Sequence, residues 1–200
     1  MGQLITVVGN SGVGKTTFVQ QLCLKTGFVQ AMEQHYRRPF QKLFSLDHES
    51  YAFENQIDYL LFRAEQELEI RNCKKTGVQD GGLDEDFFLF TRLFFQNGFL
   101  TDREFGICER TYKILRELIQ PPDLVVWLEA PLSVLTERIK IRDRGLGIVE
   151  IEDLKAMEVL LEDWLGEIDS APVISIDTVK EGREYSKGIQ LVLEQYDRLV

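Results

Sequence analysis

The feature that most constrains the fold is a glycine-rich motif near the amino terminus. Residues 9–17 read Gly-Asn-Ser-Gly-Val-Gly-Lys-Thr-Thr and directly follow an apolar run, residues 4–8, that is typical of a buried strand. The glycines permit tight turns in which successive backbone N–H groups point at one anion, and a helix starting near Lys15 adds its positive dipole end. The motif therefore predicts a phosphate-binding loop (P-loop) made of Gly9, Asn10, Ser11, Gly12, Val13, Gly14, Lys15, Thr16 and Thr17.

Two side chains of this loop carry chemistry of their own. Lys15 supplies a point charge for the β- and γ-phosphates of a nucleotide, and the Thr16 hydroxyl is a ligand for Mg²⁺. The motif indicates phosphate binding but does not identify the substrate.

The charge and composition restrict the classes of partner. The chain has 200 residues, which suits one domain spanning 1–200, and a formal net charge of −10. Such a charge argues against a general nucleic-acid or anionic-membrane surface, so any anion site is a local basic concentration. No apolar run has membrane-spanning length, and the three sparse cysteines are typical of reduced thiols in a cytoplasmic protein.

Strand and helix patterns alternate along the chain. Strands are expected at 4–8, 28–32, 76–80, 124–128 and 173–176. Helices are expected after Lys15, after Pro39, at 50–74, at 84–97, from the capping box Thr101–Glu104 to Pro121, after Pro131, at 154–168 and at the carboxyl end. This order predicts an α/β fold of the P-loop NTPase type: three α/β/α layers, with a five-stranded parallel sheet and helices on both faces.

Ligands of such sheets bind beyond the carboxyl ends of the strands, which places the P-loop, Glu33 and Asp80 on one rim. The guanine-specificity motif N-K-x-D is absent from the sequence, as is the long apolar strand ending in Asp-Glu of a motor-type ATPase. A small phosphotransferase, or a nucleotide-binding module descended from one, remains.

An ordered set of further motifs resembles the deoxynucleoside kinase family, in particular its bacterial deoxyguanosine/deoxyadenosine kinase-like branch. After the P-loop come an acid at Glu33, Pro39-Phe40, Tyr51-Ala-Phe-Glu-Asn-Gln56 and Gln79-Asp80. The series continues with residues 100–105 (Leu-Thr-Asp-Arg-Glu-Phe), Pro122-Asp-Leu124, the basic segment 138–144 and Glu162-Asp-Trp-Leu165. The resemblance covers nearly the whole chain.

The resemblance implies a reaction and a set of roles. The γ-phosphoryl group of ATP would pass, with Mg²⁺, to the 5′-hydroxyl of a deoxynucleoside, and Glu33 would accept the hydroxyl proton. Gln56 would pair with the edge of the nucleobase, Phe90 would stack on it, and Tyr51 would line the same pocket. Arg138, Arg142 and Arg144 would act from a lid segment near 138–150 on the transferring phosphoryl group.

One position departs from the family pattern. The family carries an acid-Arg-Ser/Thr triplet at the end of the third strand, whereas this chain has Asp80-Gly81-Gly82. The acid of the triplet is thus kept, and the resemblance implies that Asp80 helps Thr16 to hold Mg²⁺, directly or through water. In the family that arginine steadies the base and the 5′ region of the acceptor. Its loss should cost on the order of a hundredfold in rate. One hypothesis is that Arg37 or Arg38 supplies the missing charge and that Arg38 lines the nucleoside site; a plain surface pair before Pro39 is the alternative.

The sequence therefore leads to a cytoplasmic kinase of a purine deoxynucleoside, and the resemblance suggests a homodimer built through helices of one sheet face. Two alternatives stay open. One is a nucleotide-binding pseudokinase or regulatory subunit, with a related subunit as a heteromeric partner, which Gly81-Gly82 favours. The other is a kinase of a different small-molecule acceptor.

Overall fold

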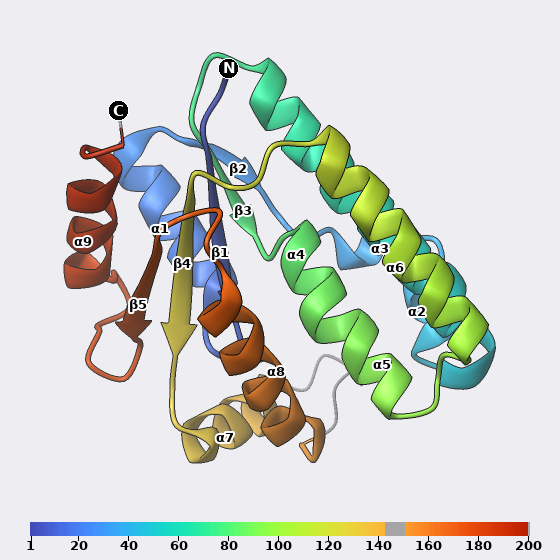
Figure 1. Ribbon diagram of the computed structural model, residues 1–200. Helices are drawn as coiled ribbons and strands as arrows, with labels where there is room; N and C mark the ends of the chain where they lie inside the picture. The colour runs from blue at the N-terminus through green and yellow to red at the C-terminus, as the bar shows by residue number, and fades with distance from the viewer. Residues whose placement is uncertain (143–150, 200) are drawn as a thin grey trace.

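The fold is organised around one parallel sheet (Figure 1). The computed structural model describes residues 1–142 and 151–199. Within them five strands lie in the order β2-β3-β1-β4-β5. Their bounds are β1 Leu4–Gly9, β2 Val29–Ala31, β3 Gly77–Asp80, β4 Leu124–Glu129 and β5 Val173–Asp177.

The register of the sheet brings the predicted rim residues to one edge. β1 lies at the centre and is buried at every residue, because its apolar side chains face helices on both sides. Val7 of β1 is opposite Asp80 of β3, and Gly9 is opposite Leu128 of β4. The start of the P-loop and the acid that ends β3 are therefore neighbours at the carboxyl edge.

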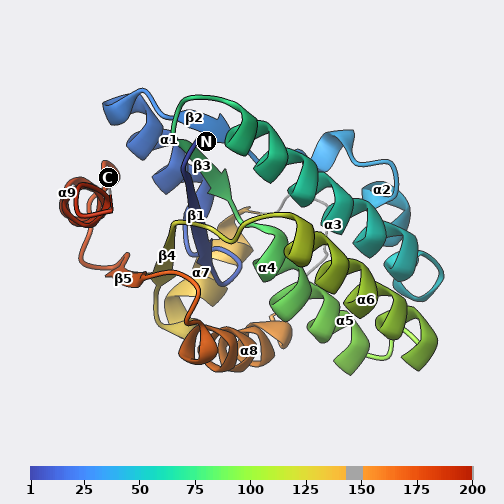
Figure 2. The same cartoon turned by 45° about the horizontal axis from the view of Figure 1, so that its top comes forward.

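Helices cover both faces of the sheet, which confirms the predicted fold class (Figures 1 and 2). On one face α1 and α9 pack through Phe18, Leu22 and Val192 against the sheet, while the other face is covered by α3, α4, α5 and α8, and α6 packs on the outside against α3. The helical bounds are α1 Lys15–Thr26, α2 Gln41–Phe44, α3 His48–Asn72, α4 Leu83–Glu85, α5 Arg92–Gln96, α6 Asp102–Leu118, α7 Leu132–Arg142, α8 Asp153–Glu167 and α9 Ser186–Tyr196. A short 3₁₀ turn, η1, spans His35–Arg37.

The long helix α3 buries only part of the side that its apolar residues predict, since Leu60 and Ala64 are buried but two of the predicted leucines are not. The sequence indicates Tyr51, Ile57, Leu60, Leu61, Ala64 and Leu68 as the inner side. Leu61 and Leu68 are instead 46% and 44% exposed, whereas Arg63 and Glu67 are 1% and 0% exposed. The prediction is wrong there because buried polar side chains, paired with partners from other elements, take the inner positions.

The segment predicted as one helix at 84–97 is divided. α4 leads into a π-helix, η2 (Asp86–Thr91), which passes directly into α5. A π-helical turn is wider than an α-helical one and is often found at functional sites. The capping box predicted at the start of α6 is present, since Thr101 and Glu104 each accept a hydrogen bond from the other's backbone N–H.

Residues 143–150, in the predicted lid segment, lie outside the described residues. Across the described parts of the chain, no helix has both the length and the apolar character needed to cross a membrane.

Candidate active site

The P-loop has the strand–loop–helix context that its sequence predicts. β1 ends at Gly9 and α1 begins at Lys15, while Gly14 caps the helix with a left-handed φ of 112°. A Cβ at Gly14 would run into the hydroxyl of Tyr185, so glycine is required here by both backbone and space. The loop therefore holds its backbone N–H groups at the amino end of α1, where an anion is favoured.

Lys15 lies between the P-loop backbone and a buried acid. Its Nζ donates to the carbonyl of Gly9 and lies 3.6 Å from Glu85 Oε1. The same Glu85 oxygen accepts the N–H of Gly9 at 2.8 Å. Burial raises the pKa of Glu85 to about 7, although Lys15 and the Gly9 N–H oppose that rise. Glu85 thus ties the first residue of the loop to its lysine.

Thr16 and Asp80, the two residues predicted to hold Mg²⁺, are in direct contact. The hydroxyl of Thr16 donates to Asp80 Oδ2 at 2.7 Å. The second oxygen, Asp80 Oδ1, is buried and has no hydrogen-bond partner among the residues that the structure describes. Burial raises the pKa of Asp80, and the nearby charge of Glu33 raises it further. A divalent cation supplies the positive charge that such an unpaired carboxylate oxygen lacks.

Glu33, which follows β2, is held beside the same strand ends. The amide of Gln66 donates to the carbonyl of Met32 at 2.9 Å and fixes the chain just before Glu33. Glu33 Oε1 lies 3.2 Å from Nη2 of Arg63, a residue of α3. The nitrogen Nη1 of Arg63 donates to the carbonyl of Asp80 at 2.7 Å. One guanidinium thus connects the acid after β2 to the end of β3.

The predicted nucleobase residue Gln56 is buried in α3 and faces the π-helix. Its Nε2 donates to the carbonyl of Asp86 at 2.9 Å, and the hydroxyl of Thr91 donates to the same oxygen at 2.9 Å. The Asp86 carboxylate accepts from Arg63 Nε at 2.5 Å. Burial raises the pKa of Asp86, and the charge of Arg63 opposes that rise. Gln56, Arg63 and Asp86 form one polar group beside Glu33.

The predicted aromatic residues lie on the apolar side of this region. Tyr51 and Phe90 are half-buried, and both pack against the core cluster that contains Phe94 and Trp164. The ring of Phe90 is 6.3 Å from that of Phe94. Both side chains therefore pack against the core, and their contact with a nucleobase stays a prediction.

Arg38 has a partner of its own. Its Nε is 3.3 Å from Asp58 Oδ2, and its guanidinium lies over the ring of Phe62, 4.2 Å from the centroid. Its neighbour Arg37 is exposed. The guanidinium that joins Glu33 to the end of β3 belongs to Arg63 of α3.

The remaining P-loop and lid residues differ in what they contact. The side chain of Asn10 turns toward α8, where its Nδ2 donates to the carbonyl of Leu154, and the Thr17 side chain is exposed. Arg138 Nη1 donates to the P-loop carbonyl of Val13 at 2.9 Å. Arg142 is the last residue of α7, and Arg144 lies outside the described residues.

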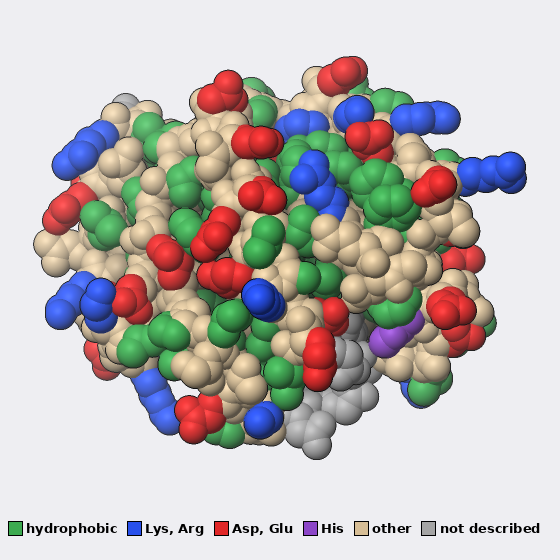
Figure 3. All heavy atoms as spheres, turned by 60° about the horizontal axis from the view of Figure 1, so that its bottom comes forward, with side chains coloured by type: hydrophobic (Ala, Val, Ile, Leu, Met, Phe, Trp, Pro, Cys, Tyr) green, Lys and Arg blue, Asp and Glu red, His purple; other side chains and the backbone are tan. Residues whose placement is uncertain are grey.

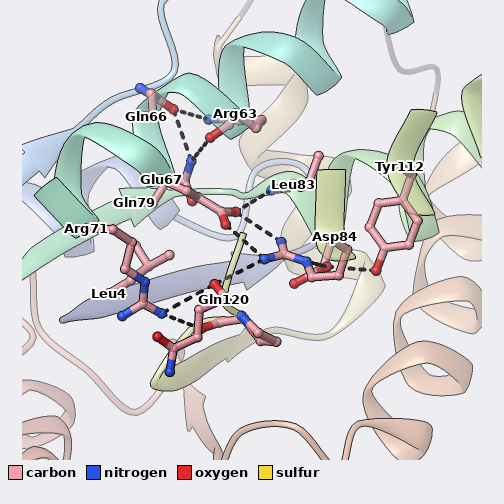
Figure 4. A network of polar contacts seen from close by, with 12 residues as sticks. Leu4, Arg63, Gln66, Glu67, Arg71, Gln79, Leu83, Asp84, Tyr112 and Gln120 are labelled. Atoms are coloured by element: carbon pink, nitrogen blue, oxygen red, sulfur yellow. Dashed lines mark hydrogen bonds and ion pairs between the residues drawn. The ribbon is translucent and has the colours of Figure 1, made fainter. Parts of the chain in front are cut away.

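Sequence reasoning missed Arg63, Glu85 and Asp86. A charged residue within a long helix normally indicates a solvated face, so Arg63 gave no warning of its burial. The available signal was spacing, because Gln56, Arg63 and Glu67 recur at helical intervals and therefore share one side of α3. Figure 4 shows how Arg63, Gln66, Glu67 and Arg71 face the strand ends and neighbouring elements from this side.

The outer surface at the carboxyl edge of the sheet is mixed in charge. Figure 3 shows this face, on which Lys and Arg side chains are scattered among Asp and Glu side chains. The cations Lys15 and Arg63 are instead held inside, with side chains 13% and 1% exposed. Among the described residues, Lys15 and Arg63 are therefore buried cations of the site and not parts of an exposed basic patch.

Comparisons with known proteins agree with this arrangement. The family model for deoxynucleoside kinase matches residues 5–200. The deoxyadenosine/deoxycytidine kinase of Bacillus subtilis is 27% identical over 176 residues, which is 86% of this chain and 81% of that protein. The deoxyadenosine kinase of Dictyostelium discoideum is 30% identical over 182 residues, or 88% of this chain and 72% of that one.

Solved structures show the same fold. The deoxyadenosine kinase from M. mycoides with bound dATP superimposes with a TM-score of 0.82 at 20% identity, and the match covers 98% of this chain and 100% of that one. These relatives are kinases by name, and none supports the alternative of a binding module. Because the family model spans nearly the whole sequence, the chain belongs to the deoxynucleoside kinase family, whose members are transferases that phosphorylate deoxynucleosides.

Proposed function

We propose that this chain transfers the γ-phosphoryl group of ATP to the 5′-hydroxyl of a purine deoxynucleoside. The observation that carries the proposal is one continuous set of contacts. It runs from Glu33 through Arg63 to the end of β3, and from Asp80 through Thr16 to the P-loop. A candidate base and a phosphate-binding loop are thereby held at one edge. Phosphoryl transfer needs mainly such positioning and charge stabilisation.

The donor would occupy the P-loop. Backbone N–H groups between Gly9 and Thr16 would surround its phosphates, and Lys15 would exchange the Gly9 carbonyl for phosphate oxygens. Arg138 already lies against the loop, at the carbonyl of Val13. Arg142 and Arg144 belong to the proposal as lid arginines that stabilise the charge of the transferring group.

Mg²⁺ would be held by Thr16 and Asp80, directly or through water. The unpartnered Asp80 Oδ1 is the feature that supports this assignment. A single carboxylate, a hydroxyl, phosphate oxygens and water form the kind of ligand set that this ion prefers. When bound, the ion would supply positive charge that stabilises the negative charge developing on the phosphate oxygens during transfer.

Glu33 would accept the proton of the attacking 5′-hydroxyl. A neutral alcohol is a weak nucleophile, so an acceptor within hydrogen-bond reach assists its attack. The contact between Glu33 and Arg63 Nη2 favours the charged carboxylate, which is the form able to take a proton.

The nucleoside would lie between α3 and η2. Gln56, whose Nε2 now donates to the Asp86 carbonyl, would pair with the base edge, and Phe90 and Tyr51 would border the base. Arg38 belongs to this proposal as a residue at the outer rim, next to Phe62. The names of the relatives, which include two kinases of deoxyadenosine, support a purine substrate.

The proposal extends to the form of the protein. Residues 1–200 form a single domain with a lid near 138–150, in a cytoplasmic homodimer. The exposed apolar residues of two neighbouring helices support the dimer: Leu61 and Leu68 on α3, and Ile107, Ile114 and Leu118 on α6. Figure 2 shows α3 and α6 side by side on the outside of the molecule. The sparse, odd cysteine content supports the location.

An acceptor screen tests the function. ATP consumption with Mg²⁺ is measured across the deoxynucleosides and their ribose counterparts, and the product is assigned by phosphorus NMR. We expect turnover on a purine deoxynucleoside that yields its 5′-monophosphate. ATP binding without turnover on any nucleoside would instead favour the pseudokinase or a different acceptor.

A further inference from the structure

The residue that follows β3, Gly81, has no side chain, and a side chain from another element occupies the space beside it. Gly81 has a left-handed φ of +78°, and a Cβ built on it would lie 2.8 Å from Arg63 Nη2 and 2.8 Å from Glu85 Oε2. The space in which a residue at position 81 would begin its side chain is therefore occupied by the Arg63 guanidinium. An arginine from α3 thus lies where the arginine that the family pattern leads one to expect at 81 would begin its side chain.

All three nitrogens of the Arg63 guanidinium donate hydrogen bonds at this point. Nε donates to Asp86 Oδ2 at 2.5 Å, Nη1 to the carbonyl of Asp80 at 2.7 Å, and Nη2 to Glu33 Oε1 at 3.2 Å. A guanidinium suits this arrangement because its donors lie in one plane and point in fixed directions. Burial by itself would lower the pKa of Arg63, but the carboxylates of Asp86 and Glu33 raise it above its ordinary value. The side chain stays charged.

We propose that Arg63 is the positioning residue that takes over the work of the missing strand-end arginine. It holds the Glu33 carboxylate oriented and ionised, and Gly81 is the residue that makes room for it. The inference rests on the proposed function, in which Glu33 accepts the proton. It assigns Arg63 a role toward Glu33 that its ion pair with Asp86 alone would not require.

Several groups face Glu33 and contribute to its pH response. Arg63 and Tyr59 approach from α3, Asp80 from β3 and Asp86 from η2; Arg38 acts on Tyr59. The acids among them oppose ionisation of Glu33, whereas Arg63 favours it. Loss of the Arg63 charge should therefore move the acid limb of the pH profile of kcat upward.

The test compares pH profiles of kcat and the nucleoside KM for the wild type, Arg63→Lys and Arg63→Gln. Arg71→Lys is the matched control, because Arg71 is a buried arginine of α3 that pairs with Asp123 far from Glu33. We expect Arg63→Gln to lower kcat on the order of a hundredfold and to move the acid limb by about one pH unit. Arg71→Lys should leave the limb in place.

Arg63→Lys guards against a variant that fails to fold, since it keeps the charge but cannot make all three contacts. It should lower kcat at least about tenfold and keep the acid limb near that of the wild type. A loss confined to KM, or an unmoved limb in folded Arg63→Gln, would overturn the inference and leave Arg63 as a partner of Asp86 only.

A double-mutant cycle separates this inference from the function on which it rests. If Arg63 acts through Glu33, the effect of Arg63→Gln on kcat should largely vanish in a Glu33→Gln background. Equal effects of Arg63→Gln in both backgrounds would contradict the positioning role. Full turnover by Glu33→Gln alone would instead contradict the proposed role of Glu33.

Discussion

At the scale of residues, the site is dominated by carboxylates that the fold has buried around two cations. Asp80, Glu85 and Asp86 are each 3% exposed or less, and burial raises the pKa of all three. Lys15 and Arg63 offset only part of that charge. Such a cluster is costly without a ligand, which supports the proposed divalent cation with its phosphates.

Glu85 allows a direct test of this cost. Its pKa of about 7 in the folded state exceeds its ordinary value of 4.5, so the folded state binds the proton more tightly across that interval. Stability is therefore gained as the pH falls through the interval and lost as it rises. Between about pH 5 and pH 8, this one group should change the free energy of unfolding by on the order of 2 kcal/mol.

Urea unfolding of the nucleotide-free wild type and Glu85→Gln, at about pH 5 and about pH 8, measures the contribution of Glu85 to the pH dependence of the unfolding free energy. The variant should lose part of the pH dependence of its unfolding free energy, because glutamine does not titrate. It should still fold, because its neutral amide oxygen can accept the Gly9 N–H. Glu54→Gln, at an exposed position of α3, is the matched control and should keep the wild-type dependence. An unchanged dependence in Glu85→Gln would show that Glu85 is not a buried acid of this kind.

The residues of the site differed in how well the sequence predicted their positions. The P-loop, Glu33 and Asp80 follow strands, so their shared edge could be predicted from the order of the elements. The contact of Arg63 with Glu33 joins residues 30 positions apart, and nothing local to either residue indicates it. The hypothesis of Arg37 or Arg38 relied on nearness in sequence, which is a weaker guide than the facing side of a helix.

At the scale of elements, the corner between β3 and α4 controls the site. Gly81 turns the chain with a left-handed φ. The backbone then begins a helical turn, in which the Asp86 N–H donates to the Gly82 carbonyl. This short turn brings Glu85 and Asp86 back beneath the P-loop and α3. A side chain at Gly81 would disturb the turn and the Arg63 guanidinium together.

Gly81→Ala should destabilise the fold by about 1–3 kcal/mol, because it adds backbone strain and a Cβ too close to Arg63 and Glu85. Gly27→Ala is the matched control: its φ of +73° is similar, and nothing lies within 4 Å of its Cβ. Chemical denaturation gives the free energy of unfolding of both variants. The difference between their losses measures the close contact of the Cβ at position 81, because the backbone strain is similar in both. Equal losses of stability would mean that the space at Gly81 is not constrained by Arg63.

The elements themselves were predictable where their pattern is local. Even the weak strand expected at 76–80 is present as β3, because neighbours on both sides complete its ladder. The π-helix η2 and the polar inner side of α3 were not predictable, since both depend on partners supplied by other elements. Hydrophobic spacing describes burial well only where apolar contacts decide which face is buried.

At the scale of the whole molecule, α3 has two different sides. Its inner side carries Arg63, Glu67 and Arg71 to partners near both ends of the sheet, and its outer side leaves Leu61 and Leu68 exposed beside the apolar residues of α6. The same helix thus holds the site and offers the surface proposed for the dimer. Pairing of two copies there would bury the apolar residues that the monomer exposes.

Leu68→Glu should convert the dimer to a monomer, because a charge would be buried at the centre of the contact. Leu24→Glu is the matched control, since Leu24 is 78% exposed on α1, away from α3 and α6. Sedimentation velocity of the three proteins measures the change in mass. A wild type that sediments as a monomer, or a Leu68→Glu variant that remains dimeric, would contradict this placement of the interface.

The architecture as a whole followed from the first motif and from the alternation of strands and helices. A parallel sheet with P-loop topology admits few arrangements, and the observed order, with β1 at the centre, is one of them. Which residues close the site around the acceptor was less accessible, because that depends on how α3 and η2 pack rather than on the order of elements.

The most direct test of the central claim is the rate of phosphoryl transfer from ATP to deoxyadenosine in Glu33→Gln and the wild type, with ATP affinity measured alongside. We expect Glu33→Gln to lower kcat by about 10²- to 10⁴-fold while ATP binds as before, because only the proton acceptor is lost. Wild-type turnover in Glu33→Gln would contradict the account, since the reaction would then not depend on the acid that the sheet and Arg63 hold in place.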